Sequence, residues 1–511
     1  MAPCVRARML AMCWPSPGVA LRGALPCLLA TVLASAALGC REREAPAPVA
    51  SEPVLPAPVV DAADASAELS LLPLRRLRGE EERPIALAER LAHLGVRAVG
   101  VAVVEDGEVV ERWARQVDRT GTLEVVDPAV LFPGGSLTSP VASALIASGV
   151  LRWAAVEGVD LESPVSRWLD RPRIGSPASS VPSSAPPTLA QVLEHSAGLA
   201  ETPVTAGTPT AAALSAILRS TAKGGALPLV DQPGRRHRFS PVGALVLREL
   251  LVTRSGKGLP ETMEELVLGP WGLTSTFFEG LPEDSSVPPV VAPPARAELW
   301  TTPSDLARWV AGLVVSARGV EPDAPLPFTL ARRALEPGPG GWGWGVRIVE
   351  PGPRFEVATG ENGDAVLVLG FVSSQSGAAI MATGDRDAGS GWLAREIALD
   401  LARERGWPGF ETEELDAEPP ASVARALVGR YRFEKGELEV GLEAGRLRVR
   451  APAGVLGPEA IDQSIHPRTP LSYVFLDRPE QLDFVRTPGA GVRGLVVGDR
   501  RAHRVESAPA G

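Results

Sequence analysis

Apolar residues recur along the chain with two different periods, and the changes of period divide the sequence into regions. Residues 84–96 (PIALAERLAHLGV) show the spacing of an amphipathic helix. Residues 98–116 alternate on both sides of an Asp-Gly pair, which predicts two strands joined by a hairpin. A mostly helical stretch then continues to about residue 315. From residue 341 the strand pattern returns in GWGWGVRIVE, RFEVATGENGDAVLVLGFVSS and GAAIMATGDR, and an amphipathic helix follows at 391–407.

This order of elements predicts the fold class. Two strands at the front, helices in the middle, and three strands with a helix at the end favour one antiparallel sheet flanked by helices, built from both ends of a domain. We assign this α/β domain, more strictly α+β, to residues 84–410. Residues 421–507 change to short alternating runs such as LEVGLEAGRLRVRA, which predict a small all-β module. At 511 residues the chain exceeds what one core of roughly 250–300 residues supports.

The N-terminal region has the features of a targeting segment. An apolar run ending in ALGC follows several arginines, and this ending is similar to the bacterial lipobox. We therefore predict a lipoprotein signal peptide over residues 1–40, with Cys40 lipidated, and a Pro/Ala-rich tether over 41–80. An ordinary cleaved signal peptide is the alternative, and translation starting at Met9 or Met12 remains open. The expected location is the bacterial envelope, at the outer membrane through the lipid anchor.

Composition excludes several classes of function. All four cysteines precede residue 41, so the body of the chain can form neither a disulfide nor a cysteine metal site. The net charge is −10 and no long basic run occurs, which argues against nucleic acid as a partner. The histidines are scattered. We expect no metal and no cofactor.

Seven segments in sequence order carry a resemblance to a known family. In this order the chain resembles the serine β-lactamase and penicillin-binding-protein-like family, in the branch of class C β-lactamases and D-alanyl-D-alanine peptidases. The terminal module resembles the lipocalin-like extension that some members carry. No single segment is specific, but the ordered set is. The segments are LFPGGSLTS with GVDLESPVSRWL, TLAQVLEHSAGL, DQPGRRHRFSP, LVLGPWGLTSTFF, LWTTPSDLARWV, GWGWGV and ATGENGDAV.

The resemblance implies a specific set of catalytic positions. The family uses a serine nucleophile, a lysine one helical turn later, a tyrosine that shares proton transfer, and a Lys-Thr-Gly or His-Thr-Gly strand motif that holds the substrate carboxylate. Here the nucleophile position is kept and the other groups are missing. The carried-over positions are Ser136 for the nucleophile, Ser139 for the lysine, Phe239 for the tyrosine, and Ala358 for the strand cation, followed by Thr359 and Gly360.

Each of these residues also has a structural interpretation. Ser136 follows two glycines and could cap the helix after it. His195 is, with Thr359 and Gly360, a candidate binding residue; it matches a family histidine, which we interpret as positioning the turn after its helix. His237 precedes Phe239 by two residues and is the alternative base. The chain has three lysines, none at a position expected for catalysis, and arginine cannot replace lysine as a base.

The missing proton carriers determine the expected function. Removing the base from a coupled nucleophile system costs on the order of 10⁴–10⁶ in rate, so we predict a non-catalytic binding module rather than an enzyme. The expected ligand is a cell-wall peptide or another small acyl compound. A weak serine hydrolase of esterase, β-lactamase or D-Ala-D-Ala peptidase type, using Ser136, is the alternative. A purely structural envelope protein is a third interpretation.

Overall fold

The computed structural model describes most of the chain from residue 69 onward. The described residues are 60–61, 69–169, 173–174, 186–199, 226–227, 229–282, 285, 287–290, 297–350, 354–457, 459–487, 489 and 491–505. The predicted signal peptide, Cys40 and the first part of the predicted tether lie outside this range. Within it, no helix is both long enough and apolar enough to cross a bilayer.

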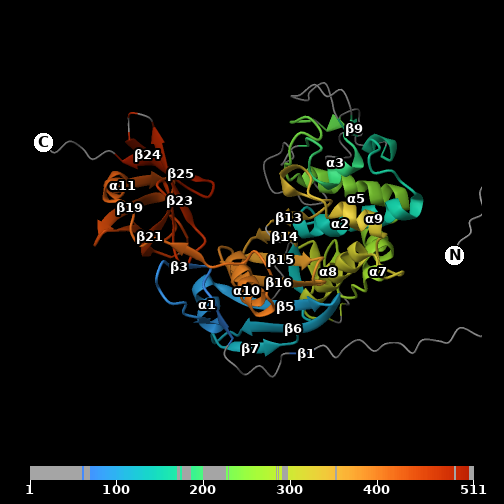
Figure 1. Cartoon of the computed structure of the whole chain (residues 1–511), viewed down its shortest axis with the longest axis horizontal. Coiled ribbons are helices and arrows are strands. Elements are labelled where there is room, and N and C mark those ends of the chain that lie inside the picture. The colour runs from blue at the N-terminus through green and yellow to red at the C-terminus, as the bar shows by residue number, and fades with distance from the viewer. Residues whose placement is uncertain are drawn as a thin grey trace, which may run out of the picture. The chain divides into compact units, whose positions relative to one another are not determined.

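The central sheet joins strands from the two ends of the domain (Figure 1). Its order is β1-β6-β5-β16-β15-β14-β13, and β16 pairs antiparallel with β5. This arrangement confirms the fold predicted from the sequence. The strands are β1 (Val60–Asp61), β5 (Val96–Glu105), β6 (Glu108–Val117), β13 (Arg347–Val349), β14 (Arg354–Glu361), β15 (Asp364–Phe371) and β16 (Ser376–Gly384), with β7 (Leu123–Val126) paired to β6.

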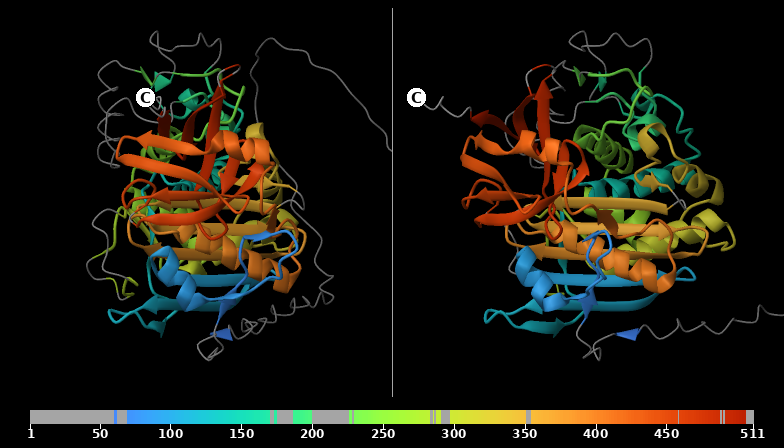
Figure 2. Two further views of the ribbon diagram at one scale, coloured as in Figure 1. Left: turned by 90° about the vertical axis from the view of Figure 1, so that its left-hand side faces the viewer. Right: turned by 60° about the vertical axis from the view of Figure 1, so that its left-hand side comes forward.

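Helices cover both faces of this sheet (Figure 2). Helices α2 (Pro140–Glu157) and α8 (Pro303–Arg318) share one core with the sheet, and α1 (Leu87–Leu94) and α10 (Ser390–Arg405) share the other. Along β15, Val366 and Val368 belong to the α2 and α8 core, whereas Leu367 and Leu369 belong to the α10 core. Because side chains alternate along a strand, this pattern also fixes which face each residue of β14 occupies.

A mostly helical region completes the α2 side of the domain. Helix α2 packs against α5, and β8 pairs with β12 at the start of α2. The elements are β8 (Phe132–Gly135), η2 (Val165–Arg167), β9 (Arg173–Ile174), α3 (Leu189–Leu193), β10 (Ala226–Leu227), α5 (Pro241–Ser255), α6 (Leu259–Met263), η3 (Glu264–Leu268), α7 (Gly269–Trp271), β11 (Phe277–Phe278), β12 (Leu299–Thr301), α9 (Phe328–Ala334) and η4 (Pro339–Gly341).

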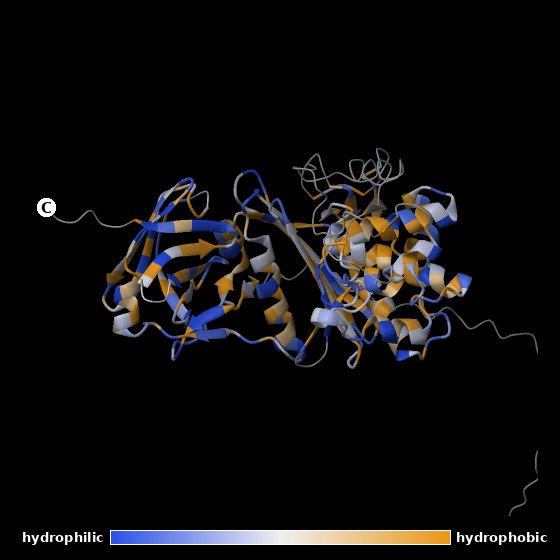
Figure 3. Ribbon diagram, turned by 90° about the horizontal axis from the view of Figure 1, so that it is seen from above, coloured by the Kyte–Doolittle hydropathy of each residue, from blue (hydrophilic) through white to orange (hydrophobic). Residues whose placement is uncertain are grey.

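The C-terminal module is a closed antiparallel barrel of eight strands, which confirms the predicted all-β module. Its strands alternate between apolar and polar residues (Figure 3), and apolar side chains such as Tyr473 and Phe475 are fully buried inside. The elements are α11 (Ala421–Leu427), β18 (Gly429–Phe433), β19 (Gly436–Glu443), β20 (Arg446–Ala451), β21 (Ile461–Thr469), β22 (Ser472–Val474), β23 (Gln481–Thr487), β24 (Gly491–Val497) and β25 (Arg500–Val505).

The segment 69–80 is folded, although the sequence analysis assigned it to the tether. It contains β2 (Ser70–Leu71), which pairs with β4 (Ile85–Ala86), and β3 (Arg75–Leu77), which pairs with β17 (Glu413–Leu415). The physical reason is the apolar run in ELSLLPLRRL, whose leucines enter both the α10 core and a small cluster with the barrel. The ordered part of the domain therefore starts before residue 84.

A buried ion pair ties helix α1 to helix α10. The Arg90 guanidinium, 2% exposed, donates to both carboxylate oxygens of Glu396, 1% exposed, at 2.7 and 2.6 Å. The indole of Trp392 donates to the same carboxylate at 2.8 Å. Both charges are thus fully partnered inside an apolar core, where a single unpaired charge is strongly unfavourable.

We expect Glu396→Ala to lower the free energy of unfolding by about 3–5 kcal/mol, because it leaves the Arg90 charge buried without a partner. Asp416→Asn is the matched control, since Asp416 pairs with Arg78 at the surface and its side chain is 65% exposed; it should change the stability by less than about 1 kcal/mol. Urea unfolding followed by tryptophan fluorescence measures both. Equal, small effects would contradict the role given to the Arg90 pair.

Candidate active-site region

Ser136 lies in a tight turn between β8 and α2. The Ser139 amide donates to the Ser136 carbonyl oxygen at 2.9 Å and closes this turn. The preceding Gly135 has a φ of +91°, which a residue with a side chain rarely adopts. The Ser136 hydroxyl lies 3.1 Å from the hydroxyl of Thr138. The group that faces the Ser136 hydroxyl is thus another hydroxyl. A hydroxyl is no base at neutral pH and does not take the proton of Ser136.

Helix α2 begins at Pro140, and Ser139 is its N-cap. The fully buried Ser139 hydroxyl accepts from the Ala142 amide at 3.3 Å and donates to the Gly134 carbonyl oxygen at 3.1 Å. The expectation that Ser136 caps the helix, with Ser139 one turn inside it, is thus corrected. Proline is preorganised for the first helical position, so the helix starts after Ser139.

Two carboxylates that the sequence analysis missed lie beside the amides of this turn. Glu298 accepts from the Leu137 amide at 3.1 Å, and the Glu361 carboxylate lies beside the Ser136 backbone amide. Burial raises the pKa of Glu361; the Ser136 amide opposes this rise, and the charge of Glu298 adds to it. The side chains beside the amides of this turn are therefore carboxylates rather than the lysine and tyrosine of the family.

A third carboxylate lies on the same hairpin as Glu361. Burial raises the pKa of Asp364 to about 6, against a hydrogen bond from the Thr383 hydroxyl, and the charge of Glu361 adds to the rise. Together with Glu298, these groups give the surroundings of Ser136 a negative character. In the family that this chain resembles, the Lys-Thr-Gly or His-Thr-Gly strand motif places a cation at this site.

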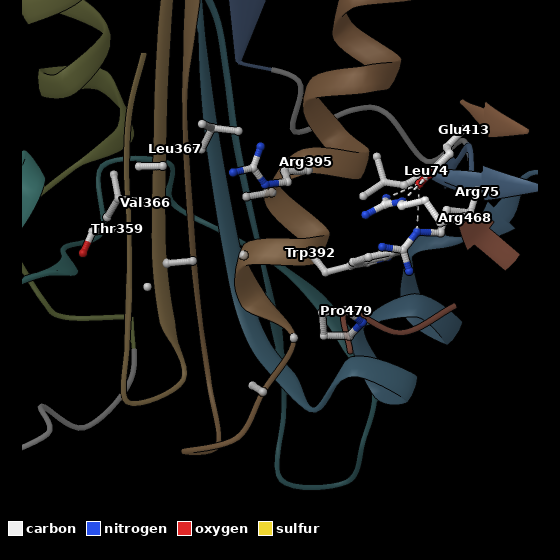
Figure 4. Close-up of a pocket in the computed structure, with 17 residues that line it drawn as sticks. Leu74, Arg75, Thr359, Val366, Leu367, Trp392, Arg395, Glu413, Arg468 and Pro479 are labelled. Atoms are coloured by element: carbon white, nitrogen blue, oxygen red, sulfur yellow. Dashed lines mark hydrogen bonds and ion pairs between the residues drawn. The ribbon is translucent and has the colours of Figure 1, made fainter. Parts of the chain in front are cut away.

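The strand residues at the motif position face two different sides. In the β14–β15 pairing Ala358 is opposite Leu367 and Thr359 is opposite Val366. Ala358, which is exposed, therefore lies on the α10 side of the sheet, and Thr359 and Glu361 face the side of α2. Figure 4 shows the Thr359 hydroxyl directed away from Trp392 of α10. The structure thus places Glu361 at Ser136 and turns Ala358 away from it.

His195 belongs to an aromatic cluster rather than to a proton relay. Its ring centroid is 4.5 Å from that of Phe239 and 5.6 Å from that of Trp342, and its Nδ1 accepts from the Ser240 amide at 3.4 Å. Burial lowers the pKa of His195 to about 3, so the ring is neutral. This geometry agrees with the interpretation that His195 positions the turn after α3.

The other groups weighed as bases lie elsewhere or are blocked. His237 stacks on Trp342 with ring centroids 4.7 Å apart, and burial, more than the nearby charge of Arg347, lowers its pKa. Lys257 pairs with Glu265 at the surface, and Lys435 lies between β18 and β19. Lys223 is outside the described residues. In the described part of the chain, no group of three or more His, Cys, Asp or Glu residues is placed to hold a metal ion.

Sequence signals for the two missed glutamates differ in strength. Glu361 directly follows Thr359 and Gly360 and precedes an Asn-Gly turn, so strand alternation alone puts it on the face of Thr359. Glu298 precedes β12 by one residue, and its approach to Leu137 depends on the pairing of β12 with β8. No local pattern reveals such a long-range pairing.

Comparison with known proteins agrees with this geometry. The model of the Beta-lactamase family matches residues 86–402. No curated protein matches the chain. Among solved structures, the octameric penicillin-binding protein homologue from Pyrococcus abyssi aligns with a TM-score of 0.51 and 16% identity, over 81% of this chain and 98% of that chain. A structure of SurE aligns with a TM-score of 0.50 and 19% identity, over 82% of this chain and 97% of that chain.

These structural likenesses concern the fold alone, because the identities are low. Their coverage of this chain exceeds the segment matched by the family model, so the likeness extends beyond residues 86–402. The family match spans more than half of the sequence and includes the turn of Ser136 and the strand of Ala358. The chain therefore belongs to the β-lactamase family.

Proposed function

We propose that this chain is an envelope lipoprotein whose β-lactamase-like domain binds a ligand without turning it over. The proposal rests on one observation: Ser139 stands at the position of the family's lysine, and its hydroxyl is already hydrogen-bonded. Its hydroxyl is occupied as donor and as acceptor in capping α2. A hydroxyl is no base at neutral pH, so Ser136 has no partner there to take its proton.

The Ser136 amide supports the same conclusion. In acyl transfer, backbone amides beside the nucleophile stabilise the developing oxyanion, often by about 10²–10³ in rate. Here the Glu361 carboxylate lies beside that amide. An oxyanion would have to displace one negative charge and approach a second, that of Glu298. Turnover is therefore opposed twice. No lysine stands at position 139 to take the proton of Ser136, and a carboxylate lies beside the amide that an oxyanion would need.

The electrostatics of the turn restrict the ligand. A carboxylate ligand needs a cation, but Glu298 and Glu361 lie at the turn, and Ala358 faces the other side of the sheet. These charges favour a neutral or amine-bearing part of an acyl compound. A segment of a cell-wall peptide or another small acyl ligand fits this description.

A weak serine hydrolase is the second candidate, and one observation favours it. Glu361 contacts the backbone of Ser136, and its raised pKa makes it a better proton acceptor than an ordinary glutamate. In this alternative Glu361 takes the proton of the Ser136 hydroxyl. To do so, Glu361 would have to move away from the Ser136 amide, because an oxyanion needs that amide. For this reason we favour the binding module.

For the natural chain we expect no hydrolysis of a chromogenic cephalosporin or a short-chain ester above that of Ser136→Ala, because Ser139 and Phe239 stand at the positions of the family's proton carriers. Intact-protein mass after incubation with a penicillin or an activated-serine phosphonate should show no adduct. Hydrolysis abolished by both Ser136→Ala and Glu361→Gln would establish the second candidate instead. Hydrolysis that survives Glu361→Gln but not Ser136→Ala would point to another base and would equally contradict the proposal.

Anchoring at Cys40 gives a second prediction. Replacing Cys40 by Ala removes the only thiol at the lipobox end, so the variant should move from the membrane fraction to the soluble envelope fraction. The matched control is Cys27→Ala, which changes a cysteine inside the apolar run and should leave the chain with the membranes. Identical fractionation of the Cys40 variant and the natural chain would contradict the anchor.

A further inference from the structure

A cavity of about 640 Å³ lies on the α10 side of the sheet (Figure 4). Strands β14 and β15, the first turns of α10, β3, β17 and the barrel all contribute to its wall. Its volume falls within the range of roughly 300–1,000 Å³ that is typical of small-molecule sites. Ala358, Thr359 and Gly360 of the strand motif line this cavity. Ser136, Glu298 and Glu361 do not, so the cavity is distinct from the turn of Ser136.

Arginines dominate the charge of the cavity wall. Three of them, Arg75, Arg395 and Arg468, line it together with one carboxylate, Glu413. In a chain with a net charge of −10, this is a local excess of positive charge. A cavity with one sign of charge concentrates ligands of the opposite sign.

Two of these arginines are already satisfied. Arg75 donates to Glu413 at 3.2 Å and to the Phe475 carbonyl oxygen at 2.7 Å, and its guanidinium stacks over Trp392 at 4.5 Å. Arg468 donates to the same carboxylate at 2.6 Å. The charge of Glu413 therefore neutralises one of the two positive charges of Arg75 and Arg468. Its hydrogen bonds also fix the positions of both arginine side chains in the cavity wall.

Arg395 differs from the other two. It is exposed on α10, and within the described residues no carboxylate pairs with it. Figure 4 shows its side chain extending from α10 toward the strand that carries Leu367. The planar guanidinium offers a pair of parallel donors that match the two oxygens of a carboxylate.

We propose that this cavity binds a small organic carboxylate, with the carboxylate on Arg395 and an apolar body against Leu74 and Leu367. A single free guanidinium suits a monoanion, and the leucines and alanines of the wall suit an apolar body. The inference goes beyond the proposed function, because it assigns a second site on the opposite face of the sheet.

Isothermal titration calorimetry of the full-length chain tests the site with N-acetylphenylalanine, its uncharged amide and phenyl phosphate. The acid should bind, and the amide should bind at least about tenfold more weakly, because it lacks the charge-assisted pair. Arg395→Ala should weaken binding of the acid by at least about tenfold. Arg332→Ala removes an equally exposed helical arginine outside the cavity and should leave binding unchanged.

Several results would overturn this assignment. Equal affinities for the acid and the amide exclude charge recognition, and equal effects of Arg395→Ala and Arg332→Ala exclude a specific site. Failure of the acid to bind at millimolar concentrations rejects the site. Tighter binding of phenyl phosphate through Arg395 makes the ligand a phosphate rather than a carboxylate. Ser136→Ala should not change the titration, so this test is independent of the proposed function.

Discussion

The pairing of β16 with β5 holds the domain together, because it joins the first long strand of the domain to the last. The two strands are in register from Gly377 opposite Val104 to Ala382 opposite Val99. Buried valine and alanine side chains of β5, and alanine, isoleucine and methionine side chains of β16, enter the cores on either side. Because β14 and β15 attach to β16, this pairing also carries the Glu361 hairpin to the turn of Ser136. The site therefore depends on a contact between residues far apart in sequence.

The structure shows which features of the family's fold this chain keeps and which side chains stand at the family's catalytic positions. The turn before α2 keeps its shape through Gly135 and the cap of Ser139, which require no reactive side chain. The charged groups beside it are the carboxylates of Glu298 and Glu361, and the positions of the family's cations hold Ser139 and Ala358. A fold tolerates such a change because its stability comes from the buried cores rather than from the site. The function of this chain therefore has to be argued from the side chains present at the turn of Ser136.

The fold was predictable from sequence because its signals are local or ordered along the chain. The Asp-Gly hairpin formed as expected, with Asp106 and Gly107 both at positive φ. The start of α2 was misplaced because two serines compete as caps, and Pro140 decides between them. Segment 69–80 was misassigned because a proline-rich tether continues into an apolar run without a break. Glu298 could not be found at all, since its role depends on strand pairing.

The central claim is that the Glu361 carboxylate holds the Ser136 amide. Selective ¹⁵N labelling of serine and NMR titration of the Ser136 amide test it directly. The account predicts that this resonance shifts with pH, with a midpoint above the ordinary glutamate value of about 4.3, and that Glu361→Gln abolishes the shift. A Ser136 amide resonance that does not respond to pH, or that titrates equally in the Glu361→Gln variant, would contradict the account.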